Sequence, residues 1–379
     1  MGLVMTILHI ISGLDDGGAE AVLFRLCQHY NPKQHHVISM SDEGKYGPLL
    51  KQLGVRVDIL DMPRGRLTMR GLWKLFQLLR CSRANIVQTW MYHADLIGGT
   101  VARLAGKENV FWGIRHTTLD PEQSSRSAII AARLSAWLSG VVPKTIICCA
   151  EEAVRVHADI GYNAKSMVVV PNGYDLDQFK LDTNKRKAIR NELGVDNSTP
   201  LLGFVARFNP QKDHANLIKA LGILMRSGKS FHCILVGSGL DASNQSLVRQ
   251  IDGEGLSLHV SLLGRRTDIP AVMNALDLHV MSSAFGEAFP NVLAEAMACG
   301  TPCISTNVGD ASEIVGETGL IVPARNPDAL AAAISKMLIA KENPAWEARC
   351  KAARRHVSEN FSIDRMIKNY ENIWFGPAA

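Results

Sequence analysis

The chain has 379 residues with 41 basic and 36 acidic side chains, a length that predicts two domains and a net charge of +5 that is too small to indicate a nucleic-acid partner. Its apolar runs are strand-length, far short of the ~20 residues that span a bilayer, and the run at 5–11 has neither a basic leader nor a cleavage site. The eight cysteines lack the paired spacing of a zinc site, so we expect reduced thiols in a cytoplasmic protein.

The first half of the chain alternates between short apolar runs and amphipathic segments. Helices are expected at 19–29 and at 69–80, where apolar residues recur at helical spacing. The β-branched and apolar runs that predict strands lie at 5–11, 36–40, 55–59, 86–90, 110–114, 145–149 and 167–170. Such alternation predicts an α/β fold with a parallel sheet covered by helices on both faces.

The composition changes after Pro171. Residues 180–200 are charged and poor in large apolar groups, which indicates a linker with a short helix. A second series of strands then follows at 201–206, 231–236, 259–262, 278–281 and 303–305. The sequence therefore predicts two Rossmann-like domains, 1–174 and 175–360, with loops facing one cleft from the carboxyl ends of both sheets. A last helix within 361–379 is expected to cross back to the first domain.

The most informative motif spans residues 285–300, after the strand at 278–281. Pro290 suits the start of a helix and Gly300 its end, so the free backbone N–H groups of the first turn could bind a diphosphate. Glu287 and Glu295 flank this position. Two carboxylates beside phosphates would repel them, so we expect each carboxylate to bind hydroxyl groups of a sugar or ribose. The alternative is that Glu287 caps the helix and Glu295 is an ordinary surface residue.

In this motif and over most of its length, the chain resembles the retaining glycosyltransferases of family 4, which have the GT-B fold. The resemblance runs from residue 7 to about 370 and is strongest at 201–323. It implies that Glu295 binds the ribose of a nucleotide-sugar donor and that Glu287 binds the transferred sugar. It further implies donor contacts at the start of the helix, through Phe289, Asn291 and Val292. Two departures are Ala288 and Asp310, where the family usually has glycine; the methyl group of Ala288 would narrow the sugar pocket.

Arg207 and Lys212 follow the strand at 201–206. They are either cations of a solvated loop or, as the resemblance implies, the groups that bind the donor diphosphate and offset its growing charge. Asp175 and Asp177 spell a metal-binding Asp-x-Asp, but they follow a domain-junction segment and are interpreted as structural. We expect no metal and no cofactor.

In the first domain, Gly17 and Gly18 form a turn between a strand and a helix, where backbone can approach a ligand closely. The dehydrogenase fingerprint Gly-x-Gly-x-x-Gly is absent from this turn. The resemblance places this loop beside the donor phosphate and the acceptor. It also places His116 near the outer hydroxyls of the sugar, although a lone histidine is usually structural.

The segment 64–83 carries basic residues and no acidic ones. It is either a solvated helix face or a surface that docks on anionic lipid headgroups, worth about 1 kcal/mol for each basic residue. Lipid docking would place the protein on the inner face of the cytoplasmic membrane.

The resemblance thus implies a retaining, metal-independent glycosyltransferase with Glu287, Arg207, Lys212 and His116 as catalytic residues. The donor is expected to be a UDP-hexose or UDP-N-acetylhexosamine, with GDP-mannose as second choice. The acceptor is expected to be a glycan, carried on a lipid during surface-polysaccharide synthesis. The alternatives are a GT-B sugar-nucleotide epimerase, a non-catalytic sugar-binding protein and an NAD-dependent oxidoreductase.

Overall fold

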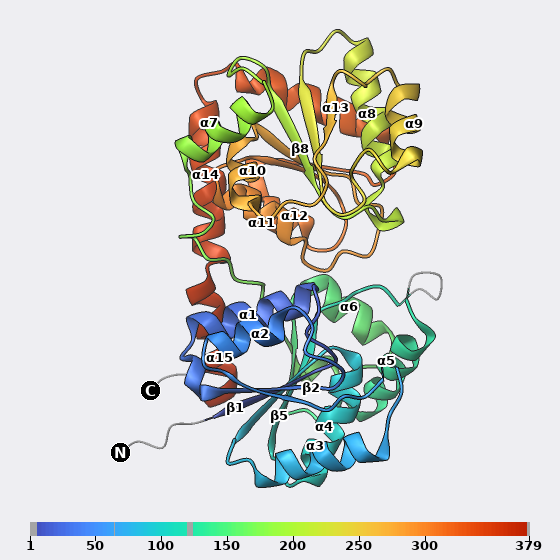
Figure 1. Ribbon diagram of the computed structural model, residues 1–379, viewed down its shortest axis with the longest axis vertical. Helices are drawn as coiled ribbons and strands as arrows, with labels where there is room; N and C mark the ends of the chain where they lie inside the picture. Colours follow the sequence, from blue (N-terminus) through green and yellow to red (C-terminus); the bar gives the residue numbers. More distant parts are fainter. Residues whose placement is uncertain (1–5, 64, 120–123, 377–379) are drawn as a thin grey trace. The chain divides into compact units, whose positions relative to one another are not determined.

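The computed structural model describes residues 6–63, 65–119 and 124–376, and the chain divides into two compact units. Unit 1 consists of Met1–Gly173 together with Ile363–Ala379, and unit 2 is Tyr174–Ser362. Met5, at the start of the first expected strand, and Arg64, at the start of the basic segment, lie outside the described residues. Each unit contains one all-parallel sheet with helices on both faces (Figure 1).

Unit 1 is built on a seven-stranded sheet whose five inner strands are short and almost continuously buried, as expected of strands covered on both faces, whereas the two edge strands are only partly buried. From one edge to the other, the strands are β3 (Arg56–Ile59), β2 (His35–Ser39), β1 (Ile7–Ile11), β4 (Ile86–Trp90), β5 (Asn109–Ile114), β6 (Thr145–Cys148) and β7 (Met167–Val169). The helices of this unit are α1 (Gly18–His29), α2 (Tyr46–Gln52), α3 (Met69–Cys81), α4 (Gly99–Leu104), α5 (Arg126–Leu138), α6 (Glu151–Asp159) and α15 (Ile363–Phe375).

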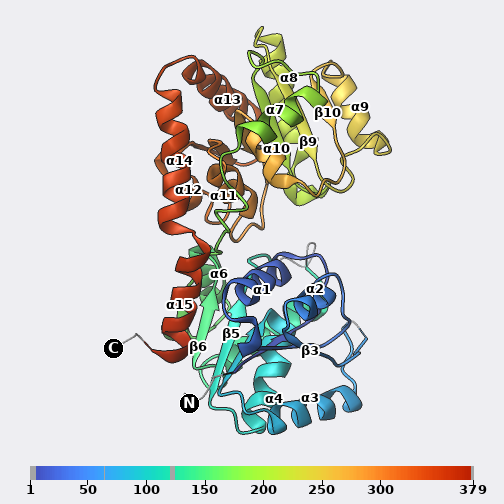
Figure 2. The same ribbon diagram turned by 60° about the vertical axis from the view of Figure 1, so that its left-hand side comes forward.

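Helix α15 is the last helix of the chain, yet it belongs to unit 1 (Figure 2). It packs on α1, and its apolar side chains, including Tyr370 and Trp374, are buried in the same core as the strands of this unit. The indole N–H of Trp374 donates a hydrogen bond to Oε1 of Gln88 on β4 at 3.1 Å. The amphipathic spacing of the last segment is therefore used to complete the core of unit 1.

Unit 2 repeats the architecture around a six-stranded sheet. In order across the sheet, its strands are β10 (Val260–Leu262), β9 (His232–Val236), β8 (Leu201–Val205), β11 (Leu278–Met281), β12 (Cys303–Thr306) and β13 (Leu320–Val322). Its helices are α7 (Thr183–Glu192), α8 (His214–Arg226), α9 (Gln245–Gly253), α10 (Ile269–Ala275), α11 (Asn291–Ala298), α12 (Ala311–Val315), α13 (Pro327–Lys341) and α14 (Trp346–Asn360). Side chains of α8, α9 and α13 share one apolar core with the strands. The predicted pair of Rossmann-like α/β domains is thus confirmed.

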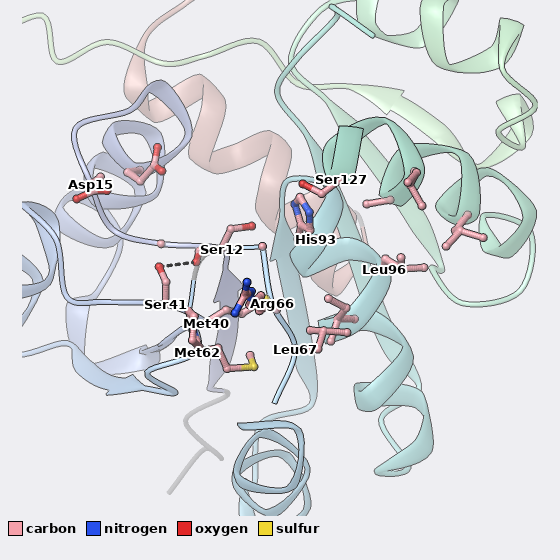
Figure 3. Close-up of a pocket in the computed structure, with 18 residues that line it drawn as sticks. Ser12, Asp15, Met40, Ser41, Met62, Arg66, Leu67, His93, Leu96 and Ser127 are labelled. Atoms are coloured by element: carbon pink, nitrogen blue, oxygen red, sulfur yellow. Dashed lines mark hydrogen bonds between the residues drawn. The ribbon is translucent and has the colours of Figure 1, made fainter. Parts of the chain in front are cut away.

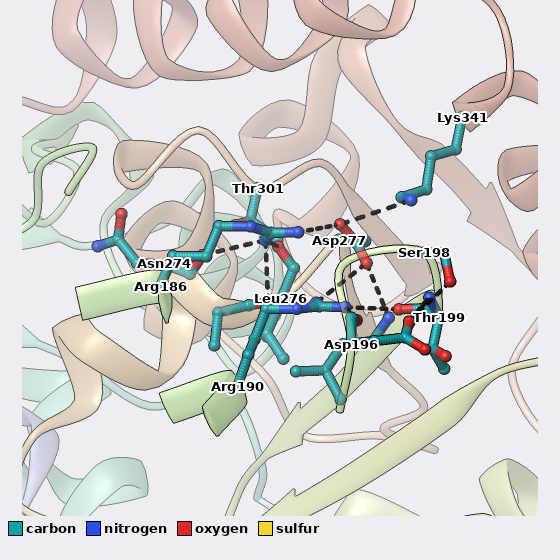
Figure 4. Close-up of polar contacts among 12 residues, drawn as sticks. Arg186, Arg190, Asp196, Ser198, Thr199, Asn274, Leu276, Asp277, Thr301 and Lys341 are labelled. Atoms are coloured by element: carbon teal, nitrogen blue, oxygen red, sulfur yellow. Dashed lines mark hydrogen bonds and ion pairs between the residues drawn. The ribbon is translucent and has the colours of Figure 1, made fainter. Parts of the chain in front are cut away.

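The segment expected to be a linker is instead fixed to unit 2 through α7. Arg190 is almost fully buried, and its Nη1 lies 3.3 Å from Oδ2 of Asp277, while Nη2 of Arg186 lies 2.7 Å from Oδ1 of the same carboxylate (Figure 4). Oδ2 of Asp277 also accepts the backbone N–H of Leu201, the first residue of β8. The charged composition of this segment therefore reflects an internal ion-pair cluster as well as solvent exposure. Among the described residues, no helix is both long and apolar enough to cross a membrane.

Candidate functional site

The centre of the candidate site in unit 2 is an ion pair between two loops. Nζ of Lys212, before α8, lies 2.5 Å from Oε1 of Glu287, after β11. Oγ of Ser283 donates to the same carboxylate oxygen at 2.7 Å. Both charged side chains are largely shielded, with relative exposures of 18% for Lys212 and 10% for Glu287. The structure thus brings together two of the predicted catalytic residues, at the carboxyl ends of adjacent strands.

Backbone hydrogen bonds fix the two loops to one another. The hydroxyl of Ser282 lies 3.0 Å from the carbonyl oxygens of both Lys212 and Asp213 and donates to them. The N–H of Ala284 donates to the carbonyl of Gln211 at 2.8 Å. Because these contacts involve the main chain, the pairing geometry of Lys212 is set by the fold as well as by its own rotamer.

The start of α11 lies at the end of the same motif. Tyr174 donates its hydroxyl to Oδ1 of Asn291 at 2.5 Å, and the ring of Phe289 packs edge-on against Phe361 with 5.3 Å between ring centres. Phe289 is buried, so its side chain serves packing. What this helix start offers a ligand is therefore the positive end of the helix, where backbone N–H groups point outward.

The loop after β12 lies against the backbone of Glu287. Gly309 has a φ of +55°, and a Cβ atom built there would lie 2.3 Å from the carbonyl oxygen of Glu287. Asp310 is buried, and its N–H donates to the carbonyl of Ala288 at 3.0 Å. The glycine needed at this close approach is thus Gly309, and Asp310 occupies a position that tolerates a side chain.

Arg207 lies in the loop after β8 and is exposed. Its backbone is crowded by Gly237, whose φ is +150° and whose added Cβ would lie 1.8 Å from the carbonyl oxygen of Ala206. Only glycine fits there without moving this loop. Of the other predicted donor residues, Val292 and Glu295 are half-buried on α11.

In unit 1, the predicted glycine turn leads directly into α1. Gly17 is the N-cap residue and Gly18 the first helical residue. A Cβ atom at Gly17 would lie 2.2 Å from Oε2 of Glu20, so this glycine leaves room for the carboxyl group. Burial, with smaller contributions from Asp15 and Asp16, raises the pKa of Glu20. An acid that is more easily protonated therefore lies next to the turn.

A cavity of about 470 Å³ lies beside this turn, entirely within unit 1 (Figure 3). It was not predicted from the sequence. One part of its lining is polar and includes Ser12, Asp15, Glu20, His93 and Ser127; the larger part is apolar and is formed by Met40, Met62, Leu67, Leu96, Ile97, Ile130, Ala131 and Leu134. A cavity with this lining suits a ligand that has a polar and an apolar end.

A single turn of π-helix, Ala94–Gly98, supplies part of that lining between β4 and α4. Asp95 within it is fully buried and accepts hydrogen bonds from Oγ1 of Thr89 at 2.5 Å and from the N–H of Gly113 at 3.2 Å. Burial raises the pKa of Asp95 to about 8, so the carboxyl group is mostly protonated at neutral pH. Such turns are frequent at functional sites, and here the turn and its N-cap contribute His93, Leu96 and Ile97 to the cavity lining.

His116 is half-buried just after β5. Its neighbour Arg115 has a structural role: Nη1 donates to Oδ1 of Asn172 at 2.6 Å, and Nη2 donates to the hydroxyl of Tyr370. The guanidinium group also lies 5.0 Å from the ring centre of Trp90. Arg115 therefore connects the end of β5 to Asn172 and to Tyr370 on α15.

One described group, His9, Cys27 and His35, has ligand atoms close enough for a metal ion. The indole N–H of Trp90 donates to Nδ1 of His9 at 3.2 Å, Nε2 of His9 lies 2.8 Å from Nδ1 of His35, and Nε2 of His35 lies 3.1 Å from the carbonyl of Tyr30. Since an indole only donates and a carbonyl only accepts, His9 must donate to His35. Burial also lowers the pKa of both histidines. We interpret the group as a neutral hydrogen-bonded chain in the core.

The Asp-x-Asp segment forms a local turn. Oδ1 of Asp175 accepts the N–H of Asp177 at 2.8 Å and that of Gln178 at 3.1 Å. This is the local hydrogen bonding that aspartate commonly provides in turns. The carboxylate of Asp175 is thus used to shape the chain at the start of unit 2.

Two family models match most of the chain. The model described as Glycosyltransferase Family 4 matches residues 16–178, and the model described as Glycosyl transferases group 1 matches residues 199–339.

Individual relatives agree with these matches. The chain is 22% identical over 310 residues to the UDP-Gal:alpha-D-GlcNAc-diphosphoundecaprenol alpha-1,3-galactosyltransferase of Escherichia coli, covering 81% of this chain and 79% of that enzyme. It is 32% identical over 241 residues to the D-inositol 3-phosphate glycosyltransferase of Mycobacterium tuberculosis, covering 60% of this chain and 48% of that protein.

The fold is shared with solved structures of HepE from Anabaena. The complex with UDP matches at a TM-score of 0.86 and 24% identity, covering 97% of this chain and 99% of that chain. The complex with UDP-glucose matches at 0.82 and 25% identity, covering 96% and 98%. These likenesses establish the GT-B fold.

Proposed function

Because this chain belongs to the family 4 glycosyltransferases with the GT-B fold, we propose that it is a retaining enzyme that transfers a hexose or N-acetylhexosamine from a nucleotide diphosphate to an acceptor hydroxyl. The observation that carries this proposal is the shielded Lys212–Glu287 pair before the start of α11. A cation and a carboxylate thus lie on connected loops, and the second of these loops leads into the N-terminal end of α11.

In the proposed reaction, Lys212 and Arg207 offset the charge that develops on the leaving diphosphate. The bond between the anomeric carbon and the diphosphate oxygen breaks, and the acceptor oxygen bonds to that carbon on the same face. The proton of the acceptor hydroxyl goes to the departing diphosphate oxygen, so no separate carboxylate base is needed. Glu287, with its charge balanced by Lys212, accepts hydrogen bonds from hydroxyls of the transferred sugar, and Glu295 accepts those of the ribose.

Two cations in place of a divalent ion make the proposed reaction metal-independent. The turn made by Asp175 supports this, because its carboxylate already accepts two backbone N–H groups. On unit 1, Gly17, Gly18 and His116 are the proposed ligand contacts.

UDP-sugars are the favoured donors and GDP-mannose the second choice. The relative from Escherichia coli has UDP-Gal in its name, and HepE binds UDP and UDP-glucose. The same relative acts on a sugar carried by diphosphoundecaprenol. A lipid-linked glycan of surface-polysaccharide synthesis is therefore the proposed acceptor, which would bring this enzyme to the inner face of the cytoplasmic membrane.

The test is a series of melting curves with UDP, GDP, ADP or NAD, each with and without EDTA. A ligand at 100 times its Kd stabilises by about 2.7 kcal/mol, which gives a clear shift in Tm. We expect UDP to stabilise the wild type equally with and without EDTA, and Glu295→Ala to lose this shift. A shift with NAD alone, or with none of the four, would contradict the proposal.

Product analysis separates the transferase from an epimerase. An epimerase releases a changed sugar nucleotide without an acceptor, whereas the proposed enzyme should release UDP and leave the remaining donor unchanged.

A further inference from the structure

The outer face of α5 is unusual because large apolar side chains on it are exposed to solvent. Ile130, Leu134 and Trp137 follow one another at helical spacing, with relative exposures of 58%, 42% and 85%, and Val141, in the turn directly after the helix, is 76% exposed. An exposed contiguous apolar surface of this kind marks an interaction site. We call these four residues the α5 stripe.

The α5 stripe is continuous with the cavity of unit 1. Ile130 and Leu134 belong to the stripe and also line the cavity. Leu67, from the segment before α3, lines the cavity as well and is 56% exposed (Figure 3). Met69 and Trp73, in the first part of α3, follow Leu67 closely in the chain and are 83% and 63% exposed. The apolar part of the cavity is therefore bordered by exposed apolar residues from two separate segments.

The charged side chains within both segments are all basic. Residues 124–144 contain Arg126, Arg133 and Lys144 and no acidic residue, and residues 62–83 likewise contain only basic charges. Trp side chains beside basic residues are typical of proteins that sit in the interface of an anionic bilayer. A protein partner would explain the stripe alone, but not its continuity with a cavity whose larger part is apolar, or the basic charge of both segments.

We propose that unit 1 docks on an anionic bilayer through the α5 stripe together with Leu67, Met69 and Trp73, and that the cavity between them takes the lipid-phosphate portion of the acceptor. In this arrangement the hydrocarbon chain of the lipid lies against Leu67, Ile130 and Leu134. Arg66, the one arginine or lysine among the described cavity-lining residues, meets the phosphate. The polar side near Asp15 and Glu20 is left for sugar hydroxyls. This inference rests on the proposed transferase function and names the acceptor class of that enzyme as a prenyl-phosphate-linked glycan.

The docking part is tested by sedimentation with vesicles of equal parts phosphatidylglycerol and phosphatidylcholine. The double variant Trp137→Ser/Val141→Ser removes two stripe residues that do not line the cavity. Its vesicle partition should fall about tenfold or more, since each buried apolar side chain contributes roughly one to two powers of ten. The matched control is Leu258→Ser/Ile339→Ser, which removes two exposed apolar side chains from unit 2 and should bind like the wild type.

Three outcomes would overturn the docking inference. The first is that the wild type does not bind these vesicles. The second is that the double variant binds them as well as the wild type does. The third is that the wild type is a dimer, the double variant is a monomer, and vesicle binding is the same in both. The stripe would then be a contact between two copies of the protein.

The cavity part is tested by melting curves with farnesyl phosphate, which has the proposed chain and head group without a sugar. It should raise the Tm of the wild type and of Ser127→Ala, whereas inorganic phosphate should not. Ser127 is exposed and lines the cavity, so Ser127→Trp should fill its mouth without disturbing the core and should abolish the shift.

An equal shift in Ser127→Trp, or no shift in the wild type, would refute the cavity assignment. UDP is added in parallel as the measure of the donor site. If UDP stabilises all of these proteins and farnesyl phosphate stabilises none, the lipid inference fails while the transferase proposal stands.

Discussion

Nζ of Lys212 lies 2.5 Å from Oε1 of Glu287, so the cation proposed to meet the donor diphosphate already has an internal counter-ion. Both side chains are largely shielded from water, and charges in such surroundings need a partner. A diphosphate arriving at Lys212 would supply additional negative charge. The hydroxyl of Ser283 remains available to Glu287 and keeps one of its oxygens oriented.

This pairing leads to a first prediction about catalysis. Lys212→Ala and Arg207→Ala should each lower kcat about 10²–10³-fold, as expected for loss of one preorganised charge-stabilising group. Initial rates of UDP release at saturating donor measure the effect. Lys219→Ala, which removes an exposed lysine from α8, is the control and should behave like the wild type. Turnover near the wild-type rate in both site variants would remove these residues from the mechanism.

Gly237, which lies against the backbone of Ala206 and Arg207, gives a prediction about stability. In Gly237→Ala, the new methyl group would meet the carbonyl oxygen of Ala206, and the free energy of unfolding of unit 2 should fall by about 2–4 kcal/mol. Gly228→Ala is the matched control, because Gly228 also has a positive φ, of +76°, but no atom lies within 4 Å of its Cβ position. It should cost only about 1–2 kcal/mol. Urea unfolding that gives equal costs for the two variants would contradict the steric argument.

The buried ion-pair cluster of unit 2 gives a second prediction about stability. Asp277→Asn removes the negative charge that faces Arg186 and Arg190, and should destabilise unit 2 by about 3–5 kcal/mol in urea unfolding. The control is Glu254→Gln, which breaks the exposed pair with Arg226 and should cost at most about 1 kcal/mol. A cost of similar size for both variants would show that burial of the cluster has no energetic consequence.

A buried histidine gives a prediction about pH. His157 is fully buried, its ring lies 2.8 Å from the hydroxyl of Tyr92, and burial lowers its pKa to about 4. An unfolded histidine has a pKa near 6.5, so the unfolded chain takes up a proton between these values and the folded chain does not. Stability linked to His157 is therefore complete above pH 6.5 and is lost as the pH falls from 6.5 towards 4.

The measurement is the free energy of unfolding at several values between pH 7 and pH 5. The wild type should lose stability over this range, and His157→Gln, which cannot take up the proton, should lose less. His29 is exposed, and His29→Gln should leave the slope unchanged. A slope that is the same in all three proteins would rule out this coupling.

The sheets of both units could largely be predicted from the sequence because their strands are buried on both faces. Such strands appear as short continuous apolar runs, as in β1 and β8. Strand β13 (Leu320–Val322) was not predicted, although β7 and β10, which are equally short, were. The role of α7 was also missed: Asp277 lies 87 residues after Arg190, and no local rule connects them.

The candidate site was predictable to a similar degree. The motif around Glu287 was found because its residues are consecutive, and Lys212 because it follows a strand end. The cavity was not found, because its lining comes from separate segments between Ser12 and Leu134. The α5 stripe illustrates a further limit: residues at the spacing of 130, 134, 137 and 141 usually form a core face, and only the fold reveals that they are exposed.

The anchoring of α7 decides how this protein can be divided for experiments. Unit 2 is one uninterrupted segment, so a fragment that contains it should begin at Tyr174 and end at Ser362. A shorter fragment that begins at β8 would lack Arg186 and Arg190 and would bury the carboxylate of Asp277 without its counter-ions. Unit 1 cannot be made by truncation alone, because α15 completes its core, and a fragment of it would need residue 173 joined to residue 363 by an engineered linker.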